Sequence, residues 1–177
     1  MLDGIINSGI SKEIITIILA MLPVAELRLA LPLAMTVFDL PWYEAFALSV
    51  IGNVIPVPLL LLFFDGVSKL VQQTKIGKRF ITWLLTRTAN KTDMIEKYKH
   101  FGLIIFVAIP LPLTGAWTAS LAAYILGLKF RSAFLDIVLG VIGAGIIVTA
   151  LTFLGWWGAA IAIAGFIILI GVGAYKL

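Results

Sequence analysis

Apolar residues fall into five blocks along the chain, separated by short polar stretches and by one long one. The blocks cover residues 14–38, 45–64, 101–128, 131–154 and 156–175. About 20 residues of α-helix cross the roughly 30 Å hydrocarbon layer of a bilayer, so each block is long enough to reach deep into a membrane. The pattern therefore predicts an all-α, polytopic membrane protein with little sequence left for a soluble domain.

Two of these blocks contain helix breakers near their middle. In residues 14–38, Pro23 interrupts the apolar run and suits the first position of a second helix, because proline has a fixed φ and no N–H. In residues 101–128, two prolines and Gly115 cannot all lie inside one smooth helix. We therefore predict that both blocks are re-entrant hairpins, which enter and leave the membrane on one side. The prolines assigned to their breaks are Pro23, Pro32, Pro110 and Pro112.

Each predicted hairpin precedes one uninterrupted apolar block, which suggests an internal repeat of about 87 residues. The first repeat covers residues 11–64, with a hairpin at 11–38 and a full span at 45–64. The second covers residues 101–154, with a hairpin at 101–128 and a full span at 131–154. A basic connector at 65–100 joins the repeats, and a final span at 156–175 completes a single transmembrane domain, residues 1–177.

The placement of lysine and arginine favours this arrangement, because short cytoplasmic loops collect positive charge. If all five blocks crossed, the basic residues that flank them would divide nine to three between the two faces; with two hairpins and three spans they divide eleven to one. The repeats are then inverted in the plasma membrane, with the N-terminus outside and the C-terminus cytoplasmic. Broken helices in inverted repeats are a recurring transporter architecture, with the substrate site between them. We expect the two breaks to face each other, because irregular backbone is tolerated in lipid only where protein or a polar cavity surrounds it.

The basic connector contains apolar residues at helical spacing. Ile76, Phe80, Trp83 and Leu84 predict an amphipathic helix lying on the bilayer, and a solvated charged loop is the alternative. The basic residues sit beside membrane segments and no nucleic-acid motif is present, so a DNA-binding role has no support. Membrane lipids are the expected partners.

The segment PVAELRLALP places Glu26 and Arg28 beside the first predicted break. Two positions correspond to about 200° on an α-helix, so we expect these side chains to point away from each other. Glu26 lies in the first turn after Pro23, where the helix dipole favours negative charge. Arg28 suits a phosphate or a carboxylate, and the alternative is a tie to a backbone carbonyl that only fixes the hairpin. Insertion of each charged side chain at the bilayer centre costs about 2.5–3.5 kcal/mol. Charges that are kept at such a cost usually have a function, so we expect one here.

Three further polar positions are candidates. Thr114 and the free backbone amides near Pro112 are predicted to hold the same anion at a helix N-terminus. Asn53 precedes two prolines and either lines the pore or bonds locally at a kink. Asp136 is either a proton carrier, like Glu26, or an interfacial acid near the basic residues that precede it.

Other chemistry is sparsely represented. The chain has no cysteine and one histidine, which excludes disulfides and makes ordinary zinc sites untenable. His100 is expected in the connector at the membrane interface, without a partner. No metal, cofactor or catalytic motif is apparent, so we expect no enzyme activity. Small residues around Gly140 and Ala144 predict close helix approach, which would suit a homodimer.

Three segments carry a family resemblance. PVAELRLALPLAM, GNVIPVP and FVAIPLPLTGAWTASLAAYILGL resemble, in this order, the pattern of the putative small multidrug export protein family, which is grouped with the DedA-like, or VTT-fold, membrane proteins. The resemblance implies two re-entrant hairpins and a transport role, and the association of DedA-like proteins with lipid carriers implies a lipid-phosphate substrate. It places motif residues at Glu26, Arg28, Pro32, Asn53, Pro110, Pro112, Thr114, Gly115 and Trp117.

These observations favour a small transporter or lipid translocase that moves an anionic or amphiphilic substrate by alternating access of the two hairpins. Arg28 would bind the head group, and Glu26 would carry a proton or gate the site. One alternative is an exporter of lipophilic cations that uses Glu26 as the counter-charge. Another is a non-transporting membrane scaffold or assembly factor, whose basic connector would bind anionic lipids or a protein partner.

Overall fold

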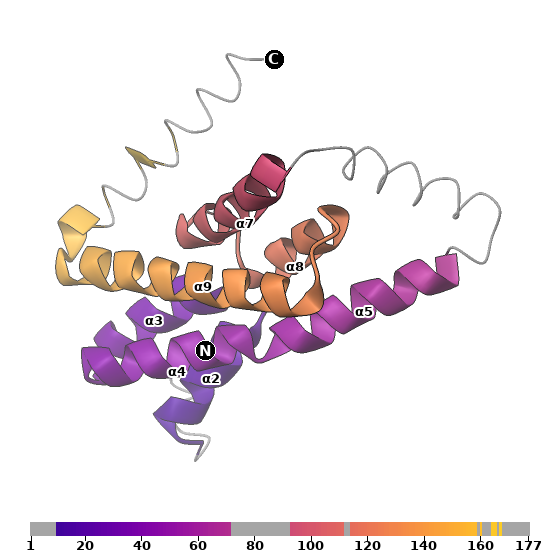
Figure 1. The fold of residues 1–177 in the computed structure, drawn as a ribbon. Helices are drawn as coiled ribbons and strands as arrows, with labels where there is room; N and C mark the ends of the chain where they lie inside the picture. The colour runs from indigo at the N-terminus through magenta and orange to yellow at the C-terminus, as the bar shows by residue number, and fades with distance from the viewer. Residues whose placement is uncertain are drawn as a thin grey trace.

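The computed structural model describes residues 10–71, 93–111, 114–158, 160, 164–165 and 167. Every regular element in these residues is an α-helix, so the predicted all-α class is confirmed for them. The helices are α2 (Lys12–Met21), α3 (Glu26–Thr36), α4 (Trp42–Val54), α5 (Pro56–Val71), α7 (Asp93–Ala108), α8 (Ala116–Ile125) and α9 (Phe130–Phe153) (Figure 1).

Two stretches of helix are long and apolar enough to cross a membrane. One is Trp42–Phe64, formed by α4 and the first part of α5, and the other is Phe130–Phe153, which is α9. They coincide with the spans predicted at 45–64 and 131–154. Most of the predicted final span, and the predicted amphipathic helix of the connector, lie outside the described residues.

The first broken block consists of α2 and α3. Ser11 caps α2, and hydrogen bonds from the backbone amide of Glu13 and from the Ser11 hydroxyl lower the pKa of the Glu13 carboxylate. The helix ends at Met21 because the residue before a proline avoids the α conformation, and Leu22 is accordingly extended, with ψ of 138°. The break predicted at Pro23 is confirmed, although the chain resumes its helix only at Glu26.

Pro32 was expected at a break, and that expectation is wrong, because Pro32 lies inside α3. A proline within a helix removes one hydrogen bond, here the one to the Arg28 carbonyl four residues earlier. Burial of Leu31 and Ala34 on either side of Pro32 supports the helix through this point.

The second broken block consists of α7 and α8. Helix α7 ends at Ala108, two residues before Pro110, which confirms a break at that proline. Helix α8 begins at Ala116, with Gly115 at its N-cap in an extended conformation. Pro112, the other proline assigned to this break, lies outside the described residues.

Both broken blocks fold back on themselves, and a lysine ties the two ends of each. Lys12 Nζ, at the start of α2, donates to the carbonyl oxygen of Phe38, just past α3, at 2.8 Å. Lys99 Nζ, in α7, donates to the carbonyl oxygen of Leu126, at the end of α8, at 3.1 Å. The two lysines lie 87 positions apart and the two carbonyls 88 apart, so the same tie occurs at equivalent places. Each block is therefore a helical hairpin.

The glycines of the long helices allow each hairpin to pack closely on the helix that follows it. A Cβ at Gly52 would lie 2.5 Å from the carbonyl oxygen of Ile17 in α2, and a Cβ at Gly140 would lie 2.9 Å from that of Ile104 in α7. The other two glycines of α9 also pack against residues of the same chain: Gly143 faces Ala108 and Gly145 faces Phe46. The glycines proposed for a homodimer thus already serve packing within one chain, and the dimer itself stays a prediction.

The two long helices run antiparallel. The Trp42 ring, at the start of α4, lies 6.5 Å from the Phe153 ring, at the end of α9, and Phe46 one turn further along packs against Gly145. Figure 1 shows α9 running alongside α4, with α2 on one side of this pair and α7 and α8 on the other. Helix α3 contacts both α4 and α9, and α8 contacts both α5 and α9, so each hairpin reaches the long helix of the other half.

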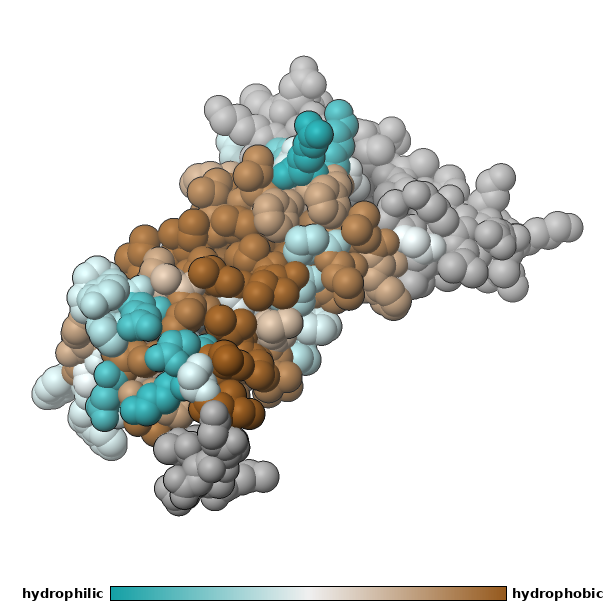
Figure 2. Space-filling view, turned by 90° about the horizontal axis from the view of Figure 1, so that it is seen from below, coloured by the Kyte–Doolittle hydropathy of each residue, from teal (hydrophilic) through white to brown (hydrophobic). Residues whose placement is uncertain are grey.

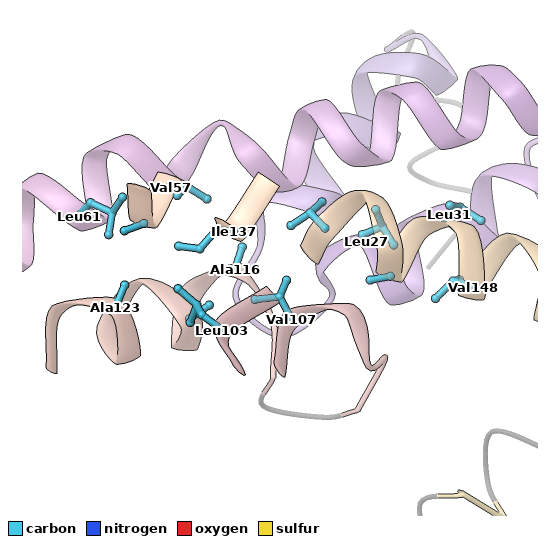
Figure 3. Close-up of a cluster of buried hydrophobic side chains, with 14 residues drawn as sticks. Leu27, Leu31, Val57, Leu61, Leu103, Val107, Ala116, Ala123, Ile137 and Val148 are labelled. Atoms are coloured by element: carbon cyan, nitrogen blue, oxygen red, sulfur yellow. The ribbon is translucent and has the colours of Figure 1, made fainter. Parts of the chain in front are cut away.

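Apolar side chains fill the space between the two halves. Figure 3 shows residues of α3, α5, α7, α8 and α9 converging on one cluster, with Leu27, Val57, Val107 and Ile137 among its most buried members. Large apolar residues also face outward, and Figure 2 shows them as a continuous band between hydrophilic groups at two ends. Outward apolar surface of this extent suits contact with lipid.

Candidate functional site

The breaks of the two hairpins meet at Arg28 and Thr114. Arg28 Nη2 donates to Thr114 Oγ1 at 2.8 Å, although the residues lie 86 positions apart. The Thr114 hydroxyl in turn lies 2.9 Å from the carbonyl oxygen of Ile109 and 2.8 Å from that of Leu111, both within the second break. A side chain of α3 is thereby tied to the irregular backbone between α7 and α8, and the two breaks lie together as expected.

Glu26 occupies the start of α8. A Cβ at Gly115 would lie only 1.5 Å from Glu26 Oε2, so the carboxylate fills the space that any other residue at the N-cap would need. The backbone N–H of Trp117, in the first turn of α8, interacts with the same carboxylate. The first N–H groups of a helix lack partners within it and favour negative charge. Glu26 therefore acts as the N-cap that α8 does not obtain from its own side chains.

Trp117 supplies a third contact between the breaks. Its indole N–H donates to the carbonyl oxygen of Met21, the last residue of α2, at 3.1 Å. The last carbonyls of a helix also lack partners within it. The end of α2 and the start of α8 are thus each capped by a side chain from the opposite hairpin.

Glu26 and Arg28 form an ion pair, so the expectation that they point apart is wrong. Arg28 Nη1 lies 3.6 Å from Glu26 Oε2. The expectation assumed regular helical geometry at both positions, whereas Glu26 has a φ of 47°. A residue other than glycine in this region costs about 1–3 kcal/mol, and such strain clusters at functional sites. The strain brings both charges to one side of α3.

Burial makes these contacts electrostatically strong. Glu26 is 5% exposed and the Arg28 side chain 17% exposed. Charge-assisted hydrogen bonds strengthen where the surroundings exclude water. The Arg28 cation, the Thr114 hydroxyl and the N-terminus of α8 all favour an anionic group, and the Glu26 carboxylate occupies that place.

Asn53 is buried near the end of α4, and no hydrogen bond among the described residues joins it to Glu26 or Arg28. It is 3% exposed, and its Oδ1 has no hydrogen-bond partner among the described residues. Ser49, one turn earlier, is fully buried, and its Oγ likewise has none within the described part of the chain. Asn53 as a pore-lining residue remains a prediction.

Asp136 pairs with His100, a contact that the sequence analysis missed. His100 Nδ1 bonds to Asp136 Oδ2, joining α7 to α9, and Asp136 is 8% exposed. His100 lies in α7, at the end of the predicted connector, and the expectation that it has no partner is wrong. The repeat could have placed His100 in a helix, since His100 follows the lysine that ties the second hairpin, as Glu13 follows the lysine of the first.

The described residues contain no group of three or more His, Cys, Asp or Glu that could hold a metal ion. Two apolar helices of membrane-crossing length, flanked by hairpins that meet at the Glu26–Arg28 pair, indicate a helical membrane protein. The chain belongs to the family described as putative small multi-drug export protein, whose pattern matches residues 26–147. No curated protein and no solved structure matches the chain.

Proposed function

We propose that the protein is a transporter that moves an anionic, amphiphilic substrate across the plasma membrane through the contact between its two hairpin breaks. The observation that carries this proposal is the Arg28–Thr114 bond, which links the breaks at a buried cation. Membership of the small multidrug export family supports an export role. The earlier resemblance to DedA-like proteins favours a lipid carrying a phosphate as the substrate.

The hairpins are proposed to be re-entrant. Helices α2, α3 and α8 have 10, 11 and 10 residues. At 1.5 Å per residue each is about 15–17 Å long, roughly half the hydrocarbon thickness of about 30 Å. Arms of this length reach the middle of the bilayer and return, which puts the breaks near the midplane. Inverted repeats then give opposite faces to the two hairpins, with the N-terminus outside and the C-terminus cytoplasmic.

Glu26 is proposed to act as the gate. Its carboxylate lies where a substrate anion would be stabilised most strongly, beside the Arg28 cation and at the N-terminus of α8. A phosphate or carboxylate that binds there has to displace Glu26, and a proton taken up by Glu26 would remove the competing charge. Displacement would also break the cap on α8, which frees the second hairpin to move. Binding and opening are thereby coupled through one side chain.

The test is transport by the full chain in proteoliposomes. The anionic probe is a phosphatidic acid with a nitrobenzoxadiazole label on one chain, whose movement between leaflets is followed by dithionite quenching. We expect Arg28→Ala to slow this movement by about tenfold or more, equivalent to about 1.4 kcal/mol or more. The matched control is Arg131→Ala, which removes an exposed arginine from the start of α9 and should leave the rate unchanged.

Export of lipophilic cations is the second candidate, favoured by the buried Glu26 carboxylate and the family description. It is tested with ethidium in the same vesicles, with Glu44→Gln as the control for Glu26→Gln. A cation substrate predicts that Glu26→Gln abolishes ethidium transport while Arg28→Ala does not. If neither variant changes movement of either probe, the assignment of this site to transport is wrong.

A further inference from the structure

His100 and Asp136 join α7 to α9 away from the contact between the breaks. Asp136 is buried, and its described partner is the imidazole of His100, whose side chain is 34% exposed. A buried carboxylate is costly unless it is paired, so the charge on the imidazole matters to the stability of this contact. The function proposed for Arg28 and Glu26 makes no use of this pair.

The first hairpin has no such pair at the equivalent positions. Asp136 lies four residues before Gly140, whereas the residue four before Gly52 is Leu48, which has no ionisable group. Glu13, which corresponds to His100, bonds instead to the backbone and hydroxyl at the start of its own helix. The two hairpins therefore share their packing on the long helices, but one of them adds a titratable pair to it.

We propose that His100 and Asp136 form a proton-binding site that sets how firmly the second hairpin is held on α9. An imidazole is the side chain that most readily gains or loses a proton between mildly acidic and mildly alkaline pH. With the proton bound, the contact is an ion pair; without it, the buried carboxylate keeps a neutral partner and loses the compensating charge. Docking of α7 on α9 is therefore firmer in mildly acidic than in mildly alkaline solution.

Other ionisable groups near this pair do not change the sign of the effect. Lys99, the neighbour of His100, is bonded to the Leu126 carbonyl, and lysine stays charged throughout this pH range. Helices α3 and α4, which also pack on α9, carry their ionisable side chains at the breaks and at the opposite end, and the described side chains of α5 include none. The ionisable side chains described on α7, at the start of α9 and on α8 are Tyr98, Lys99, Lys129, Arg131 and Tyr124.

Spin-label distances measure docking of each hairpin without any knowledge of the substrate. The chain contains no cysteine, so pairs of labelled cysteines can be introduced freely. Ile105 and Leu139 report on the second hairpin, and Ile18 and Ile51 are the equivalent exposed positions for the first. The full chain is placed in lipid nanodiscs and measured by double electron–electron resonance at about pH 5.5 and about pH 8.5, one mildly acidic and one mildly alkaline.

We expect the second pair to give a longer or broader distance distribution at the higher pH, and the first pair to give the same distribution at both. His100→Gln and Asp136→Asn should remove the pH dependence of the second pair. His100→Arg, a permanent cation opposite Asp136, should keep the acidic distribution at both pH values. The distance across the first pair serves as the folding control for each variant.

Three results would overturn the proposal. One is a pH-independent distribution for the second pair in the unchanged protein. Another is an equal response of both pairs, and the third is a pH response that persists in both His100→Gln and Asp136→Asn. None of them bears on transport through Arg28, so this proposal and the proposed function fail separately.

Discussion

The two hairpins share a frame but differ in the chemistry of their breaks. Each has a lysine that ties its ends together and a glycine contact with the following helix. The first break covers residues 22–25 and leads into the charged start of α3, whereas the second covers residues 109–115 and leads into α8 through Gly115. The lysine tie and the glycine contact are present in both hairpins, and the charged site lies where the two breaks differ.

The difference has a physical consequence at the start of α8. Gly115 at the N-cap has no side chain with which to cap the first amides of α8, and the first hairpin supplies Glu26 to fill that place. The two breaks are therefore complementary: the first supplies the carboxylate that the start of α8 in the second lacks.

The largest effect is expected from Gly115→Val. Its side chain would occupy the place of the Glu26 carboxylate and force the two breaks apart. We expect transport of the labelled phosphatidic acid to be lost and the free energy of unfolding to fall by about 1–3 kcal/mol, as for other overpacked sites. Both are measured on the purified chain, the second by unfolding in mixed detergent micelles. Gly102→Ala is the control, because a Cβ at Gly102 would have no atom within 4 Å; equal behaviour of the two variants would contradict the account.

The next largest effect is expected from Gly52→Ala and Gly140→Ala, which test the glycine contact that both hairpins make with the helix that follows them. Each added methyl would press on a backbone carbonyl of the preceding hairpin. We expect both variants to lower the free energy of unfolding by similar amounts, about 1–3 kcal/mol. A large loss for one glycine and none for the other would show that the two interfaces are not equivalent.

A smaller effect is expected from Lys12→Met and Lys99→Met. Each variant removes one charge-assisted hydrogen bond at the base of its own hairpin, worth about 1 kcal/mol in a partly exposed setting. The spin-label pair on the affected hairpin should broaden while the other pair stays unchanged. Broadening of both pairs in either variant would mean that the ties are not local.

The smallest effect on stability is expected from Asn53→Leu. The Asn53 Oδ1 has no hydrogen-bond partner among the described residues, and an apolar side chain of similar volume leaves no polar atom unsatisfied. We expect the free energy of unfolding to change by no more than about 0.5 kcal/mol. A loss several times larger would reveal a partner for this amide, and unchanged stability with slower transport would favour a pore-lining role.

The sequence predicted the helices well because apolar block length and proline position act locally. Pro23 and Pro110 lie at breaks for reasons that the neighbouring residues determine. The prediction for Pro32 was wrong because burial of Leu31 and Ala34 stabilises the helix against the hydrogen bond lost at the proline. That burial comes from segments distant in the sequence. Local signals are reliable where tertiary packing does not oppose them.

The site was predicted in its residues but not in its contacts. Charges in an apolar run singled out Glu26 and Arg28, the polar Thr114 was singled out near Pro112, and Gly115 was singled out as a helix breaker. The ion pair was missed because a positive φ at Glu26 breaks the helical spacing on which the expectation depended. The His100–Asp136 pair was missed because its members are 36 positions apart and belong to different helices.

Arg28 and Thr114 hold the two breaks together. A double-mutant cycle with Arg28→Met and Thr114→Val, measured as free energies of unfolding of the full chain in mixed micelles, tests this contact most directly. A hydrogen bond to a charged group predicts a coupling energy of about 1.5–3 kcal/mol between the two sites. Additivity within about 0.5 kcal/mol, as for residues that do not touch, would contradict the account.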